Sequence, residues 1–241
     1  MWLVDQEKVI RSDVFKRFPA LLSQEEHEKW LAIRAERKRQ QFLIARGALR
    51  IILCQYIPDS EPEKLNIAID PFGKPVLKNA AHLGIEFNIS HAKGKIVLGI
   101  ASNKRIGVDI EYMNPNRNWE EIARQYFHPS EWRNSRSGLL TLSEFYKLWT
   151  LKEAFLKAEG RGMTVALNNF YFDNRSASAP KLVVDKSCSD FDGVISWSFS
   201  HQYLDDNYSL AIGLEGSAEP FKDSILVRDF LCLATTYSMK T

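Results

Sequence analysis

Ile106-Gly107-Val108-Asp109-Ile110-Glu111-Tyr112 is the most informative segment for the architecture, because the order of predicted elements begins again here. Its β-branched and alternating residues are typical of a β-strand. The central part, Val108-Asp109-Ile110-Glu111, is similar to Val4-Asp5-Gln6-Glu7 near the start of the chain. An internal similarity of this kind indicates a duplicated structural unit.

Two further pairs of segments follow one another in the same order along the chain. Phe42-Leu43-Ile44-Ala45 can be laid on Phe145-Tyr146-Lys147-Leu148, and Phe87-Asn88-Ile89-Ser90-His91 on Trp197-Ser198-Phe199-Ser200-His201. We therefore predict an α+β fold of two similar halves, 1–104 and 105–241, related by pseudo-twofold symmetry. Each half is expected to hold a small antiparallel sheet with packed helices, and a site in such a protein belongs in the cleft between the halves.

Hydrophobic periodicity and turn residues give both halves the same order of elements. In the first half we expect a strand at 2–4, a helix entered through a Ser23-x-x-Glu26 capping box, a helix through Phe42 and Tyr56, and strands at 65–69, 75–77, 85–90 and 96–101. In the second half we expect a strand at 106–112, helices at 118–126, from 129 and at 142–159, and strands near 165–172, 182–184, 194–200 and 208–213.

Composition restricts the class of protein. The chain has 241 residues, 45% of them hydrophobic, which is enough for one large core or two packed halves. Asp5 and Glu7 interrupt the N-terminus before a signal-length apolar run, and no stretch approaches the roughly 20 apolar residues of a membrane span. We expect a cytoplasmic protein without a membrane partner. The net charge of +2 requires no nucleic acid, and the three cysteines lack the spacing of a zinc site.

Two carboxylates on the strand at 106–112 are candidate metal ligands. Asp109 and Glu111 point to the same face, because side chains repeat every second residue along a strand. Mg²⁺ is held by one or two carboxylates together with substrate phosphates. A solvated sheet face is the alternative interpretation of the same pattern.

The helix predicted at 142–159 places Glu153 and Lys157 one turn apart, at the edge of an apolar face. A surface ion pair is the alternative for these two residues. Lys152 falls inside the apolar face, where a charge is costly unless an anion or a carboxylate meets it. This pattern suggests a lined cleft, with Asp109, Glu111 and Glu153 around one cation and lysines for phosphate oxygens.

Other basic and polar residues are candidates for phosphate contacts. Lys74 lies in a turn between a glycine and a proline. Ser90 and His91 cannot form a hydrolase dyad, because neighbours on a strand face opposite sides. We interpret Ser90 and His91 as phosphate donors, with a structural histidine as the alternative. A basic segment is either a solvated helix face or an anion site; it comprises Arg34, Arg37, Lys38, Arg39, Arg46 and Arg50.

Taken together, these segments resemble the 4′-phosphopantetheinyl transferases, in particular the larger surfactin-synthetase-activating type, a monomer of two pseudo-symmetric halves. The resemblance covers roughly residues 36 to 163. It is carried by the helix at 42–50, Gly73-Lys74-Pro75, 87–91, 106–111, Phe127-His128-Pro129-Ser130-Glu131-Trp132, Trp149-Thr150-Leu151-Lys152-Glu153-Ala154-Phe155-Leu156-Lys157 and 159–163.

The resemblance implies a role for each matching residue. Asp109, Glu111 and Glu153 match the Mg²⁺ ligands, for which Mn²⁺ is a substitute, and Lys157 matches the lysine that contacts the pyrophosphate. Ser90, His91, Lys74 and Arg46 match contacts to coenzyme A, with Lys74 in the adenine-binding turn and Arg46 near the 3′-phosphate. The first half then carries the coenzyme A contacts, and the second carries the metal site and the catalytic helix.

The implied reaction moves phosphopantetheine from coenzyme A to a serine of an acyl or peptidyl carrier protein and releases adenosine 3′,5′-bisphosphate. Glu153 is the candidate general base, directly or through water, and Lys157 stabilises the transition-state charge. A Mg²⁺-dependent phosphodiesterase would use similar residues, and a non-catalytic module could bind coenzyme A or a carrier protein. The sequence does not identify the carrier among those of fatty acid, polyketide or peptide synthesis.

Overall fold

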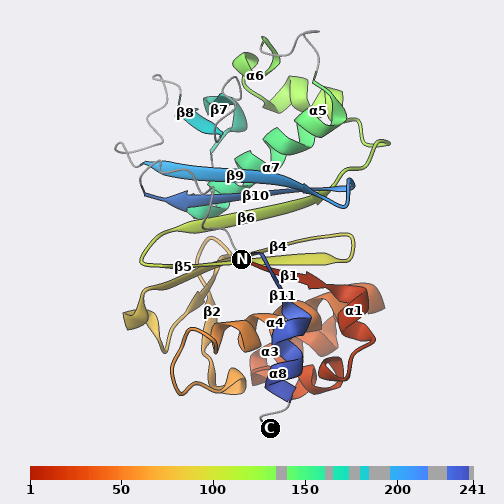
Figure 1. Ribbon diagram of the computed structural model, residues 1–241, viewed down its shortest axis with the longest axis vertical. Helices are drawn as coiled ribbons and strands as arrows, with labels where there is room; N and C mark the ends of the chain where they lie inside the picture. Colours follow the sequence, from red (N-terminus) through yellow and green to blue (C-terminus); the bar gives the residue numbers. More distant parts are fainter. Residues whose placement is uncertain (134–139, 161–164, 174–179, 185–195, 217–226, 239–241) are drawn as a thin grey trace.

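Two sheets lie face to face in the middle of the molecule, and helices cover their outer sides (Figure 1). The computed structural model describes residues 1–133, 140–160, 165–173, 180–184, 196–216 and 227–238. One sheet has the order β11-β1-β5-β4, with the bounds Arg228–Asp229, Trp2–Asp5, Lys95–Ser102 and Ile85–Ala92. The other has the order β6-β10-β9, with the bounds Ile106–Tyr112, Tyr208–Glu215 and Trp197–Leu204. The predicted α+β fold with small, mainly antiparallel sheets is confirmed.

The same order of elements occurs twice. The strands β1-β5-β4 of the first sheet correspond to β6-β10-β9 of the second. An 18-residue helix follows the first strand in each set, α4 (Glu36–Leu53) and α7 (Leu142–Glu159). A small hairpin then precedes the last two strands, β2 (Ile67–Ile69) with β3 (Pro75–Leu77), and β7 (Phe170–Asp173) with β8 (Lys181–Val184). The three pairs of similar segments therefore fall on β1 and β6, on α4 and α7, and on β4 and β9.

Three apolar clusters hold these layers together. The first lies between the β1-β5-β4 sheet and its helices and includes Phe18, Leu49 and Phe87. The second lies between α7 and the strands on its side and is rich in aromatic rings. The third joins the two sheets through Val97, Val108 and other aliphatic side chains. Burying both faces of each sheet fixes how the two halves meet.

The shorter helices frame this structure. Their bounds are α1 Gln6–Ile10, α2 Phe18–Leu21, α3 Gln24–Ala32, α5 Trp119–Tyr126, α6 Pro129–Arg133 and α8 Phe230–Ser238. The predicted capping box is confirmed, because Ser23 and Glu26 cap α3 reciprocally. The predicted strand near 165–172 is wrong in its first part, where a 3₁₀ turn at Leu167–Asn169 precedes β7. Residues 194 and 195 of the expected strand at 194–200 lie outside the described residues.

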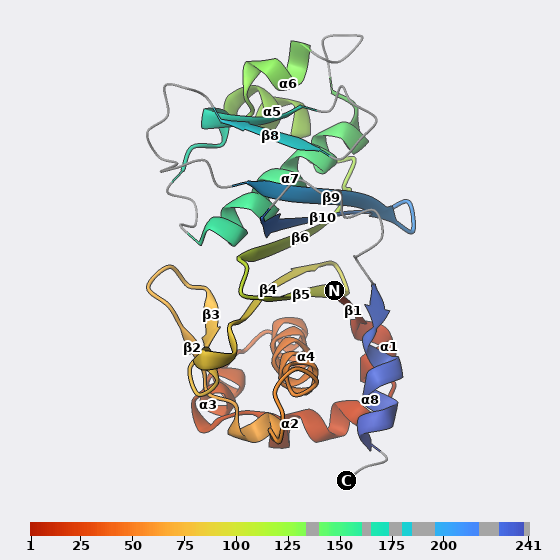
Figure 2. The same cartoon turned by 60° about the vertical axis from the view of Figure 1, so that its left-hand side comes forward.

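The C-terminal segment crosses the predicted boundary between the halves. β11 pairs in parallel with β1, and Phe230 and Ala234 of α8 are fully buried in the first apolar cluster. Figure 2 shows α8 below the first sheet, and this helix packs against α4 and β1. The second half was predicted as 105–241, but residues 228–238 pack with the first half. The physical reason is that β11 pairs with the edge of β1, and α8 covers the apolar residues beneath that strand.

None of the helices in the described ranges is long and apolar enough to span a lipid bilayer.

Candidate active site

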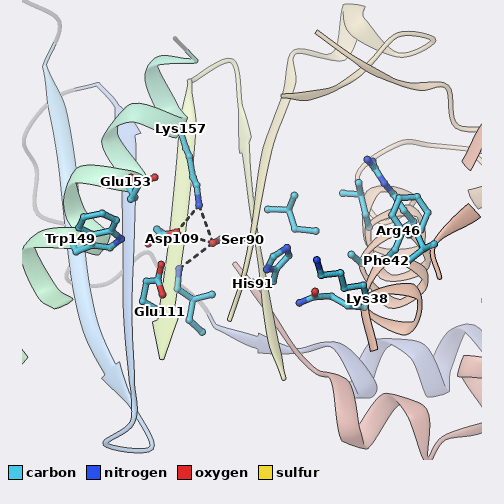
Figure 3. Close-up of a pocket in the computed structure, with 16 residues that line it drawn as sticks. Lys38, Phe42, Arg46, Ser90, His91, Asp109, Glu111, Trp149, Glu153 and Lys157 are labelled. Carbon is cyan, nitrogen blue, oxygen red and sulfur yellow. Dashed lines mark hydrogen bonds and ion pairs between the residues drawn. The ribbon is translucent and has the colours of Figure 1, made fainter. Parts of the chain in front are cut away.

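A cavity of about 670 Å³ opens where the two halves meet. Its walls come from α4 in the first half, from β4 and β6 in the middle, and from α7 in the second half. Figure 3 shows Asp109, Glu111, Glu153 and Lys157 on one side, Lys38, Phe42 and Arg46 on the other, and Ser90 and His91 between them. Of the eight site residues predicted above, all but Lys74 line this cavity.

The helix α7 brings Glu153 and Lys157 to the strand β6. Its start is fixed by a capping box between Thr141 and Glu144, and it ends at Gly160 in the left-handed conformation. Gly107 of β6 allows the close approach, because a Cβ at this position would lie 2.0 Å from the backbone oxygen of Ala154. The glycine therefore sets the distance between the acidic strand and the helix.

The three acidic side chains influence one another electrostatically. Burial, reinforced by the charge of Asp109, raises the pKa of Glu111 to about 7. Burial also raises the pKa of Glu153, and Asp109 again adds to the effect. Concentrated negative charge in a partly buried cavity is costly, so the site favours a cation.

Lys157 supplies one such cation. Its Nζ lies 2.6 Å from Asp109 Oδ1 and 3.0 Å from Ser90 Oγ. Ser90 in turn donates to Asp109 Oδ1 at 2.9 Å, and its Oγ accepts from the backbone N–H of Ile110. Ser90 thus joins β4 to β6 and orients Asp109, a role that sequence reasoning did not assign. The exposed His91 points to the other side of the strand, at the edge of the cavity.

The carboxylates suit a hard metal ion in their chemistry. Asp109 Oδ2 is buried and has no hydrogen-bond partner within the described part of the chain, so one oxygen is left for a cation. Across the described residues, however, no three His, Cys, Asp or Glu side chains are assembled as a finished metal site. The arrangement expected from the sequence therefore stays a prediction, with Asp109 held by Lys157 in this structure.

The wall on α4 contains the predicted Arg46 and also Lys38, which the sequence placed only within a basic run. Lys38 and Arg46 line the cavity together with Gln41 and Phe42. The guanidinium of Arg46 lies 5.6 Å from the centre of the Phe42 ring. The basic run thus divides between the cavity, the surface and the interior, since Arg34 and Arg37 are exposed and Arg50 is fully buried. The helical periodicity of α4 is the signal that could have predicted which of these side chains face the cavity, the solvent or the interior.

Two lysines occupy other environments. Lys74, in the turn between β2 and β3, lies 3.4 Å from Glu86. The interpretation of Lys152 as part of the cleft is wrong, because its Nζ lies 3.1 Å from Glu131 and donates to the backbone oxygens of Leu167 and Phe170. Both charged side chains are fully buried. The expected anion is thus an internal glutamate, and this pair fixes α6 and β7 against α7.

Comparisons with known proteins agree on one family. A family model described as the 4′-phosphopantetheinyl transferase superfamily matches residues 105–213. A Synechocystis protein that carries the name of a 4′-phosphopantetheinyl transferase is 34% identical over 203 residues, which is 81% of this chain and 80% of that protein. The 4′-phosphopantetheinyl transferase gsp of Aneurinibacillus migulanus is 30% identical over 72% of this chain and 70% of its own length.

A solved structure is also similar over part of the chain. The holo-(acyl-carrier-protein) synthase of Bacillus anthracis, in complex with CoA (3′,5′-ADP), is 21% identical. The similarity covers 46% of this chain and 96% of that one, with a TM-score of 0.36. This score is too low to support a conclusion.

Proposed function

Because this chain belongs to the 4′-phosphopantetheinyl transferase superfamily, we propose that its cavity transfers phosphopantetheine from coenzyme A to a serine of an apo carrier protein. The observation that carries the proposal is the 34% identity to a protein of that name over four-fifths of both chains. The cavity supports it, because acidic residues and a lysine from β6 and α7 face basic residues of α4. The basic groups can contact pyrophosphate oxygens directly, and the acidic groups can hold a metal ion that binds the pyrophosphate.

We propose Asp109, Glu111 and Glu153 as the residues that would hold Mg²⁺, or Mn²⁺ in its place. Asp109 Oδ2, which has no hydrogen-bond partner among the described residues, and the raised pKa values of Glu111 and Glu153 support this assignment. When bound, the metal ion would neutralise the pyrophosphate and stabilise negative charge on the leaving oxygen.

The residues of this chain then have separate tasks. A bond forms between the carrier serine Oγ and the β-phosphorus of coenzyme A, and the bond to adenosine 3′,5′-bisphosphate breaks. Glu153 accepts the serine proton, directly or through water. Lys157, already at the centre of the site, stabilises charge on the transferred group.

Basic and polar residues along the cavity bind the substrate. We assign phosphate contacts to Ser90, His91 and Arg46, with Arg46 near the 3′-phosphate, and we assign Lys74 to the adenine end. Arg46 on α4 and His91 on β4 both line the cavity, so an extended ligand could contact both. Lys74 would have to exchange its contact with Glu86 for the nucleotide.

The remaining expectations extend this proposal. Both walls of the cavity come from one chain, which supports a monomer, and the repeated strand order supports pseudo-twofold symmetry of the halves. We place the reaction in the cytoplasm, with coenzyme A and an acyl or peptidyl carrier protein as partners.

Mass spectrometry of an apo acyl carrier protein tests the function. After incubation with the enzyme, coenzyme A and Mg²⁺, we expect the carrier to gain the mass of the phosphopantetheine arm. A parallel sample without carrier should release no adenosine 3′,5′-bisphosphate. Release in that sample would indicate a phosphodiesterase, and no reaction with several acyl and peptidyl carriers would favour a binding module.

A further inference from the structure

Glu26, at the start of α3, is a buried carboxylate next to the cavity wall. Its side chain is 8% exposed, and it lies between Arg46 and Arg50, which are one helical turn apart on α4. Arg50 is fully buried, whereas Arg46 is 20% exposed and lines the cavity. A single internal acid therefore connects the interior of the first half with a cationic group of the site.

The two oxygens of Glu26 have different surroundings. Oε2 accepts from Arg50 Nε at 2.7 Å and lies 2.6 Å from Arg50 Nη2. Arg50 also donates to the backbone oxygens of Pro62 and Leu65, which fixes it firmly. Oε1 is buried, lies 3.7 Å from Arg46 Nε and has no hydrogen-bond partner in the described ranges. The position of Glu26 is thus set by Arg50, while its second oxygen faces Arg46.

This arrangement limits where the Arg46 side chain can point. The guanidinium lies close both to the ring of Phe42 and to the negative charge of Glu26. An arginine that interacts with both a ring and a carboxylate has lost much of its rotamer freedom before a ligand arrives. Preorganisation of this kind increases affinity by lowering the entropic cost of binding.

We propose that Glu26 is a positioning residue that holds the Arg46 guanidinium on the cavity wall in the orientation that recognises the 3′-phosphate of coenzyme A. The inference rests on the proposed function, which assigns Arg46 to that phosphate. It adds a residue outside the cavity lining that sets selectivity between coenzyme A and its analogue without the 3′-phosphate.

Calorimetric titration with coenzyme A and with dephospho-coenzyme A tests the inference. The readout is the dissociation constant of dephospho-coenzyme A divided by that of coenzyme A. A general loss of stability would leave this ratio unchanged. Arg46→Met tests the assignment of Arg46 itself and should reduce the ratio by on the order of tenfold, the value of one charge-assisted hydrogen bond. Glu26→Asp keeps the charge but withdraws the carboxylate, and it should reduce the ratio by about threefold. In the Arg46→Met background, Glu26→Asp should have no further effect on the ratio.

Ser23→Ala is the matched control. Ser23 Oγ accepts from the Glu26 backbone N–H, so this variant weakens the same helix start and leaves the Glu26 side chain in place. Its ratio should equal that of the wild type. Arg46→Lys provides a second variant if Glu26→Asp does not fold, because it keeps the charge, removes Nε and spares the buried Glu26–Arg50 pair. It should lower the ratio.

The outcomes distinguish an incorrect role of Arg46 from an incorrect role of Glu26. If Arg46→Met leaves the ratio unchanged, the assignment of Arg46 fails and the inference fails with it. If Arg46→Met lowers the ratio but Glu26→Asp does not, or if both lower it additively, the role of Glu26 is overturned while the proposed function stands.

Discussion

Glu153 is the residue on which the proposed chemistry depends most. It lines the cavity and shares it with Asp109 and Lys157. Glu153→Gln should keep coenzyme A affinity within about tenfold but lower turnover by on the order of 10²-fold or more, the scale of general acid–base catalysis. Steady-state kinetics and titration with coenzyme A measure the two effects. Glu120→Gln, an exposed substitution on α5, is the control. Wild-type turnover in Glu153→Gln would remove this residue from the mechanism.

His201 should make the fold sensitive to acid. Burial, assisted by the charge of Lys147, lowers its pKa from 6.5 to about 4. The unfolded chain then binds the proton more tightly, so stability is present above pH 6.5 and is lost as the pH falls towards 4. The loss is on the order of 3 kcal/mol at pH 4.

Urea unfolding of His201→Gln between pH 7 and pH 4 checks this effect. The free energy of unfolding of the variant should fall less on acidification than that of the wild type. His82→Gln, at an exposed site, should follow the wild-type curve. Equal pH dependence in all three proteins would show that His201 is not the sensitive group.

Single residues also show which features of the site could be predicted from the sequence and which could not. The face and spacing of Asp109, Glu111, Glu153 and Lys157 could be predicted, because strand and helix periodicities determine them. The partner of Lys152 could not, since Glu131 reaches it through tertiary packing. The orienting role of Ser90 was missed for the same reason, because its partner Asp109 is on another strand.

At the scale of elements, the contact between α7 and β6 builds the acidic wall. Gly107 and Gly213 are register partners in β6 and β10, beneath the helix. Gly107→Ala should destabilise the protein by about 3 kcal/mol, the upper range of overpacking, and should also lower turnover. The reason is that a methyl group there meets the backbone of Ala154, which cannot move without shifting α7.

Gly213→Ala is the matched control for Gly107→Ala. A Cβ at Gly213 would meet mainly the Phe199 ring, at 2.8 Å, and the Ala154 oxygen only at 3.7 Å. A side chain gives way more easily than a helix backbone, so turnover should be less affected. Thermal unfolding and kinetics of both variants measure this. A larger effect on turnover at Gly213 would contradict the proposed role of Gly107.

Elements with strong local signals could be predicted from the sequence. The bounds of α7 and β6 agree with the predictions, because a capping box, a terminal glycine and clear periodicity mark them. The short helices α1 and α2 were missed, since four or five residues carry little periodicity. β11 and α8 were missed because the sheet edge and core that they cover are formed by residues far away in the sequence.

At the scale of the whole molecule, the C-terminal segment should stabilise the first half. Phe230 is fully buried, and its ring centre lies 6.2 Å from that of Phe18. Phe230→Ala should cost about 3–5 kcal/mol and should accelerate hydrogen exchange in β1 and α2 more than in α7. Val227→Ala, at a partly exposed position, is the control. Faster exchange confined to α7 would contradict this packing.

The central claim is that the acids of β6 and α7 share one cation in the cavity. Electron paramagnetic resonance of free Mn²⁺, titrated with protein in the presence of coenzyme A, tests it most directly. We predict a single Mn²⁺ bound per chain, with an affinity that falls by about tenfold or more in Asp109→Asn and again in Glu153→Gln, because each removes a carboxylate ligand. Unchanged Mn²⁺ affinity in Glu153→Gln would show that the helix and the strand do not share an ion.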